Sequence, residues 1–179
     1  MWQLFPIILS PHDPEWKNFY KKEADLLQKH FGKTAVRIRH IGSTAVEGLL
    51  AKPTVDILLE VADNANLAAV RQLTIECGYT VMEETTVPEY RLDLCKGYTP
   101  LGFAEKVFHL HLRYAGDNDE LYFRDYLMEY PSVAKEYEQM KLLLWPIYEF
   151  DRDEYTAAKT DFVREYTEKA KAEFGDRYE

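Results

Sequence analysis

Two alternating segments joined by a run of small residues constrain the fold more than any other feature of the chain. Val36–Ile41 alternates with a period of two, Gly42-Ser43-Thr44 interrupts the pattern, and Thr54–Val61 alternates again. Because successive side chains of a β-strand point to opposite faces, the pattern predicts two strands linked through a small-residue turn. On the second strand Asp56, Leu58 and Glu60 share one face, opposite the apolar residues Val55, Ile57, Leu59 and Val61.

Helical and strand periodicities account for most of the remaining chain. They predict helices over 14–31 and 66–77, strands over 79–82, 90–95 and 107–114, and helices over 120–130, 132–145 (ended by Pro146) and 153–174. The expected fold is α+β, with a mixed β-sheet of about five strands, flanking helices and a C-terminal helical part. We expect a single domain over 1–179, in which 1–115 form the sheet core and 116–179 form the C-terminal helices.

Charge and cysteine content narrow the classes of function. The 179 residues include 22 Lys and Arg against 31 Asp and Glu, and the net charge of −9 argues against nonspecific binding to nucleic acid or to an anionic membrane. Two cysteines are too few for a disulfide framework or a cysteine metal site, and they favour a reducing, cytoplasmic location. Met1–Ser10 has no basic residue and contains Pro6, so we expect neither a signal peptide nor a membrane span there.

One face of the predicted sheet carries charged and imidazole side chains from three strands. They are Asp56, Glu60, Arg91, Asp93, His109, His111 and Arg113. A solvated face of an antiparallel sheet has the same appearance, so this pattern alone does not distinguish a site from an ordinary surface. It does indicate where the chemistry of the chain would lie.

Several separated blocks of the sequence form one recognisable pattern. The central block is His40-Ile41-Gly42-Ser43-Thr44-Ala45-Val46-Glu47-Gly48-Leu49, followed by Ala51-Lys52-Pro53-Thr54-Val55-Asp56-Ile57. The other blocks are Pro11–Trp16, His109-Leu110-His111, Phe123–Leu127, and Tyr137 with Lys141. Together these blocks resemble the GrpB family, which belongs to the nucleotidyltransferase-like superfamily. The resemblance implies a nucleotidyltransferase-like fold along most of the chain, and it specifies the fold better than it specifies a reaction.

The superfamily motif has a direct physical meaning. The resemblance assigns phosphate binding to Gly42, Ser43 and Thr44, because glycine lets the backbone approach closely and a hydroxyl donates without bulk. It assigns a divalent cation to Asp56, where the cation would bridge phosphates during an in-line displacement. The basic residues that would line the phosphate or substrate are Lys52, Arg91, Arg113 and Lys141. Ion pairing, helix tethering or simple surface exposure would explain these four residues too.

The metal site departs from the superfamily pattern. Active members carry a second acidic residue where this chain has Leu58, and Glu60 lies two positions further along, roughly 6–7 Å away. His109 and His111 lie two apart on one strand and face the same side, so with Asp56 they are the candidate catalytic and metal-binding residues. Imidazole ligands would favour Mn²⁺ or Zn²⁺ over Mg²⁺. A phosphate-binding or structural histidine pair would look the same in the sequence.

Two functions remain open from the sequence. The first is a metal-dependent nucleotidyltransferase-like protein that transfers a nucleotidyl group, or that binds a nucleoside triphosphate or another phosphorylated small molecule. The second is a catalytically silent binding or regulatory module, which the apolar residue at Leu58 favours. Family members fused to dephospho-CoA kinase imply a link between such a module and coenzyme A metabolism. The sequence specifies no substrate, acceptor or oligomeric state.

Overall fold

The structure is a computed structural model in which residues 5–179 are described. The segment in which we expect no signal peptide or membrane span is therefore described only from Phe5 onward. Within the described residues, no helix combines the length and the apolar character needed to cross a membrane. The helices are α1 (Glu15–Phe31), α2 (Leu67–Glu76), α3 (Asp119–Glu129), α4 (Pro131–Tyr148), α5 (Arg152–Ala157) and α6 (Thr160–Phe174). The strands are β1 (Ala35–Ile41), β2 (Val55–Val61), β3 (Thr80–Thr85), β4 (Arg91–Thr99) and β5 (Gly102–Tyr114).

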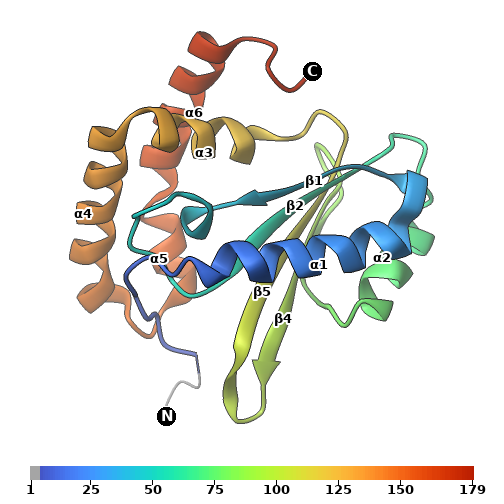
Figure 1. The fold of residues 1–179 in the computed structure, drawn as a ribbon, viewed down its shortest axis with the longest axis horizontal. Coiled ribbons are helices and arrows are strands. Elements are labelled where there is room, and N and C mark those ends of the chain that lie inside the picture. Colours follow the sequence, from blue (N-terminus) through green and yellow to red (C-terminus); the bar gives the residue numbers. More distant parts are fainter. Residues whose placement is uncertain (1–4) are drawn as a thin grey trace.

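The strands form one mixed sheet in the order β1-β2-β5-β4-β3. β2 and β5 pair in parallel, whereas the other three neighbouring pairs of the sheet are antiparallel. α1 and α2 lie in front of the sheet in Figure 1, and the C-terminal helices gather above it and to its left. This arrangement confirms the predicted α+β fold.

The front face of the sheet carries the main core. α1 begins where the Asp13 side chain accepts a hydrogen bond from the Glu15 amide at 2.9 Å, and it ends at Gly32, whose φ is 53°. Its buried side packs against the predicted apolar face of β2, which consists of Val55, Ile57, Leu59 and Val61. Each of these four side chains is at most 1% exposed, so the predicted core face is confirmed.

The opposite face of the sheet is polar but only partly open. α3 covers one part of it, where Leu58 packs with Ile41 and Leu121 and is fully buried. Glu60 is buried as well, and its carboxylate accepts hydrogen bonds from Arg37 and from two groups of the β5–α3 loop. Leu58 is therefore a core residue, and Glu60 is committed to holding this loop rather than free to serve as a second acidic ligand.

Several expected boundaries are wrong. α4 continues through Pro146 to Tyr148, because Pro146 is exposed and water can replace the hydrogen bond that proline cannot donate. The segment expected as one helix over 153–174 forms two helices, α5 and α6, with a break at Ala158 and Lys159. β4 and β5 extend beyond their expected ends and form a long hairpin, which projects at the bottom of Figure 1.

Candidate functional site

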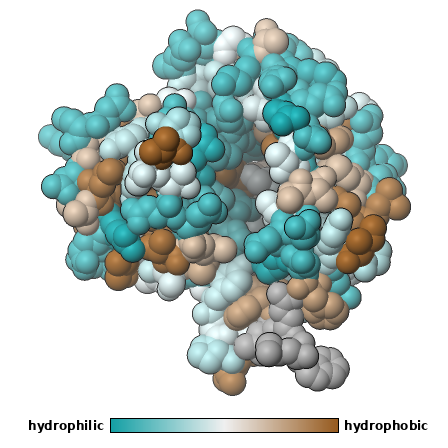
Figure 2. Space-filling model, turned by 180° about the vertical axis from the view of Figure 1, so that it is seen from behind, coloured by the Kyte–Doolittle hydropathy of each residue, from teal (hydrophilic) through white to brown (hydrophobic). Residues whose placement is uncertain are grey.

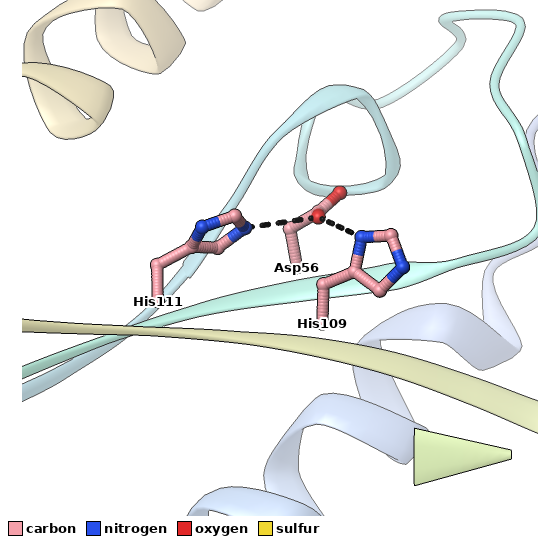
Figure 3. Close-up of side chains that lie close together, drawn as sticks. All are labelled: Asp56, His109 and His111. Atoms are coloured by element: carbon pink, nitrogen blue, oxygen red, sulfur yellow. Dashed lines mark hydrogen bonds and ion pairs between the residues drawn. The ribbon is translucent and has the colours of Figure 1, made fainter. Parts of the chain in front are cut away.

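The register of β2 and β5 brings three of the predicted site residues together. Asp56 on β2 is the direct neighbour of His109 on β5, and His111 follows two residues later. His109 Nδ1 lies 3.4 Å and His111 Nε2 lies 3.3 Å from Asp56 Oδ1, and both rings turn toward this carboxylate (Figure 3). One potential ligand atom from each residue lies within 4.8 Å of the others, a spacing that a single metal ion could bridge.

Each imidazole is also held on its far nitrogen. His111 Nδ1 lies 2.8 Å from Asp93 Oδ1, and His109 Nε2 lies 2.8 Å from the Tyr98 hydroxyl. Arg152 of α5 in turn donates a hydrogen bond to the Tyr98 hydroxyl at 2.7 Å. Histidines that bind metals usually have such a partner, which fixes the orientation of the ring. The sequence analysis missed Tyr98 because β4 runs past its expected end.

The charges of Asp56, Asp93 and His111 stabilise one another. Burial disfavours the charged form of His111, but its hydrogen bonds to Asp56 and Asp93 outweigh burial and raise the pKa of His111 to about 10. Burial also opposes the charge of Asp56, and its hydrogen bonds with His109 and His111 nevertheless hold the pKa of Asp56 well below its usual range. The structure therefore corresponds to a protonated His111 between two ionised carboxylates.

The Gly42-Ser43-Thr44 turn lies directly beside Asp56. Gly42 has a φ of 71°, and a Cβ at this position would lie 2.6 Å from Asp56 Oδ2. The Ser43 hydroxyl accepts a hydrogen bond from Lys141 Nζ at 3.0 Å. The Thr44 hydroxyl instead lies 2.9 Å from Nε2 of the buried His40. Of the three predicted phosphate-binding residues, Gly42 and Ser43 thus reach the Asp56 side, whereas the Thr44 side chain is engaged elsewhere.

On the side opposite α1 the surface is hollowed near its centre, and mostly hydrophilic residues surround the hollow (Figure 2). Four basic side chains converge near the Gly42-Ser43-Thr44 turn, and they belong to Lys52, Lys141, Arg152 and Lys159. None of the four forms a salt bridge with a carboxylate within 4.0 Å among residues 5–179. Burial lowers the pKa of Lys141 to about 7 and, with the charge of Arg152, lowers that of Lys52 to about 8. Burial and the charges of Lys52 and Lys141 lower the pKa of Lys159 as well. A bound anion would relieve this repulsion.

The sequence analysis missed Arg152 and Lys159. Arg152 begins α5, and Lys159 lies in the break between α5 and α6. Both are distant in sequence from Asp56, and no motif connects them to the strand that carries it. Their only signal was a positive charge in a helical segment, which is typical of solvated helix faces.

Arg91 and Arg113 do not belong to this basic group. Arg91 pairs with Asp117 at 2.8 Å, and Arg113 is buried and pairs with Asp93 at 2.8 Å. Both arginines line a separate cavity of about 430 Å³. Ion pairing within the protein therefore accounts for the presence of these two arginines. Arg113 is connected to His111 through Asp93, which pairs with both.

Comparisons with known proteins identify the family of the chain. The family described as GrpB protein matches residues 6–169. The glutamate-rich protein GrpB of Alkalihalophilus pseudofirmus is 34% identical over 163 residues, which cover 89% of this chain and 92% of that protein. A dephospho-CoA kinase of Mycolicibacterium paratuberculosis is 26% identical over 182 residues, which cover 89% of this chain and 45% of the kinase.

Solved structures show the same family and a related fold. The crystal structure of the conserved protein GrpB from Enterococcus faecalis matches with a TM-score of 0.77 and 29% identity, over 93% of this chain and 99% of that one. Cid1 poly(U) polymerase with bound MgGTP matches with a TM-score of 0.51 and 14% identity, over 76% of this chain and 43% of the polymerase. The second likeness concerns the nucleotidyltransferase fold alone. Since the family match spans nearly the whole chain and the sheet and helices follow the GrpB structure, the chain belongs to the GrpB family.

Proposed function

We propose that this protein binds a nucleoside triphosphate or a related phosphorylated small molecule together with a divalent metal ion, and that it transfers a nucleotidyl group. The observation that carries the proposal is the position of the Gly42-Ser43 turn, between Asp56 and the buried Lys141, whose ammonium group donates to Ser43 and to the Leu50 carbonyl but has no carboxylate partner in the described structure. Three further cations that lack a carboxylate partner lie nearby in the described structure. A polyanion next to a metal-binding carboxylate is the ligand that such a charge distribution favours.

The donor atoms fit a divalent ion of the late first row. Asp56 offers a carboxylate oxygen and His109 offers one imidazole nitrogen, and His111 offers a second nitrogen once the bound ion displaces its proton. Two imidazoles favour Mn²⁺ or Zn²⁺ over Mg²⁺, which prefers oxygen ligands and retains its waters. The hydrogen bonds of Asp93 and Tyr98 to the far nitrogens provide the outer support that metal sites usually have. When bound, such an ion would neutralise charge on a phosphate oxygen.

The other side chains of the site would bind the phosphate groups and orient the ligand. Gly42, lacking a Cβ, lets the turn lie directly against the Asp56 carboxylate, and the Ser43 hydroxyl would donate to a phosphate oxygen beside it. Lys141 would release its hydrogen bond to Ser43 and contact the phosphate as a point charge. Lys52 and Lys159 would neutralise the other phosphate groups, and these contacts together would orient the ligand for in-line displacement.

A second candidate is a binding or regulatory module that keeps the fold without catalysis. Leu58 favours it, because the position that carries an acidic ligand in active members is here fully buried against Ile41 and Leu121. The similarity to less than half of a dephospho-CoA kinase is the reason to connect such a module with coenzyme A metabolism. In this case the polyanion would bind but would not be turned over.

Loss of the Asp56 charge is expected to reduce nucleotide binding strongly. With ATP and Mn²⁺ at 100 times the dissociation constant, the wild-type protein should gain about 2.7 kcal/mol of stability, and Asp56→Asn should bind at least about tenfold more weakly. The exposed Asp63, in the loop that joins β2 to α2, provides the control Asp63→Asn, which should bind like the wild type. Thermal unfolding with and without ligand measures both effects.

The same samples separate the two candidate functions. Release of pyrophosphate from ATP by the wild type, and its loss in Asp56→Asn, would support transfer. Binding without any release, across a panel of hydroxyl and phosphate acceptors, would support the silent module. If ATP stabilises neither the wild type nor Asp63→Asn in the presence of Mn²⁺, Zn²⁺ or Mg²⁺, both proposals are wrong.

Polyanion binding is also expected to take up protons at alkaline pH. Lys141 has a pKa lowered to about 7, so near pH 8 it is mostly neutral in the free protein, and a bound phosphate would restore its charge. Calorimetry in two buffers of different ionisation enthalpy should show this uptake near pH 8. Lys141→Met should lower it by up to about one proton per ligand. Equal uptake in both proteins would place Lys141 outside the phosphate site.

A further inference from the structure

A second and larger cavity lies apart from the Asp56 site. Its volume is about 1200 Å³, and it is enclosed by α1, by the loop that joins β1 to β2, and by α3 and α4. Neither Asp56, Ser43 nor any of the four converging cations lines it. Thr44, whose hydroxyl turns to His40, lies in its wall. The loop between β1 and β2 therefore has the candidate site on one side and this cavity on the other.

The floor of the cavity is apolar. Val46 and Leu49 of the loop meet Leu127 of α3 and Ala134 of α4, and all four residues are buried and line the cavity. Small-molecule sites generally have this kind of apolar floor with a few polar groups around it, in volumes of about 300–1000 Å³. The space is therefore large enough for an organic molecule with an extended apolar body.

The rim of the cavity is basic in a protein of net charge −9. Lys17 and Lys21 of α1 face Lys135 of α4 across it, and these exposed lysines form no salt bridge with a carboxylate among residues 5–179. The acidic residues of the lining are Glu47 and Glu138, and the remaining basic residue of the lining, Arg124, pairs with Asp125. Three lysines against two carboxylates leave an excess of positive charge around the cavity.

Two histidines complete the polar part of the lining. Burial lowers the pKa of His40 to about 4, so this ring is neutral at pH 7 and adds no charge, and it stacks on Tyr20 at a centroid distance of 4.9 Å. His12 also lines the cavity, and its ring packs edge-on against Trp16 at a centroid distance of 5.3 Å.

We propose that this cavity binds an amphipathic organic anion, whose apolar body lies on the floor formed by Val46, Leu49, Leu127 and Ala134 and whose acidic head lies between Lys17, Lys21 and Lys135. The shared chemistry is an apolar group that carries a carboxylate, sulfonate or phosphate. The cavity binds it without the metal and without Asp56. The inference therefore stands whether or not the Asp56 site transfers nucleotides.

Fluorescence titration with anilinonaphthalene sulfonate, an apolar aromatic body with one acidic group, tests the proposal. The dye should bind the wild type at one site, decanoate should displace it, and the uncharged decanol should compete at least about tenfold less well. The double variant Lys17→Glu/Lys135→Glu should bind the dye at least about tenfold more weakly. The matched variant Lys22→Glu/Lys29→Glu changes two exposed lysines that do not line the cavity, and it should bind as the wild type does.

Three results would overturn the proposal. Unchanged dye affinity in Lys17→Glu/Lys135→Glu would show that the basic rim is not used. Displacement by inorganic pyrophosphate would place the dye in the Asp56 site. Loss of dye binding in Leu143→Lys would place it on the exposed apolar residues of α4, where Leu143 is 72% and Ile147 is 67% exposed.

Discussion

The Gly42→Ala variant is expected to lose polyanion and metal binding while the sheet remains folded. Gly42 combines a φ of 71° with a ψ of −175°, a region that is essentially restricted to glycine and costs other residues about 1–3 kcal/mol. A Cβ there would also lie 2.6 Å from Asp56 Oδ2, so either the turn or the carboxylate must move. We expect binding of ATP with Mn²⁺ to fall by at least about a hundredfold, since both the metal ligand and the phosphate turn are displaced.

Gly48 in the same loop provides the control. Its φ is 80°, but a Cβ at this position would meet no heavy atom within 4 Å. Gly48→Ala also places an alanine at a positive φ but meets no neighbour, so it should still bind the ligand. Calorimetric titration of both variants, together with their melting temperatures, separates strain from contact with Asp56. Equal ligand affinity in Gly42→Ala and the wild type would refute the role given to this turn.

The Leu58→Asp variant is expected to be destabilised by about 3–5 kcal/mol at neutral pH. The substitution introduces the acidic residue of the superfamily pattern at a position that is fully buried against Ile41 and Leu121. An uncompensated charge at such a position costs far more than the lost apolar contacts alone. Urea unfolding measures the change in the free energy of unfolding.

The variant Leu58→Met keeps the size and apolar character of the site, and it should lose less than about 1.5 kcal/mol. The comparison of the two variants shows whether the position of Leu58 can still accommodate a second metal-binding carboxylate. A Leu58→Asp protein that is as stable as Leu58→Met and binds Mg²⁺ more tightly than the wild type would show that this face is open to a second acidic ligand.

Local patterns predicted that Asp56, His109 and His111 share a face of the sheet, because strand alternation determines which side chains lie on each face. Asp56, His109 and His111 lie on neighbouring strands, and the parallel pairing of β2 with β5 converts their shared face into contact. The contact of Asp93 with His111 follows from the antiparallel pairing of β4 with β5 in the same way. For these residues, the alternation within short strand segments is enough to predict which side chains lie on the same face.

Only part of the basic group was predicted. The resemblance assigned Lys52 and Lys141 to the phosphate, whereas Arg152 and Lys159 reach the turn through the packing of the C-terminal helices, and a charged residue in a helical segment is usually solvated. The effect of Pro146 on its helix also depends on its surroundings, because an exposed position tolerates the missing N–H of proline and a buried position would not. Tertiary packing, rather than local propensity, decides each of these cases.

The central claim is that Asp56, His109 and His111 form a metal site beside a phosphate-binding turn. Its most direct test is a calorimetric titration of Zn²⁺ and Mn²⁺ into the wild type, His111→Ala and the control His30→Ala, which changes a histidine of α1 bonded to its own helix. We predict one site per chain in the wild type and in His30→Ala, with affinity at least about tenfold lower in His111→Ala. Equal affinities in His111→Ala and the wild type, or no binding to any of the three proteins, would contradict the claim.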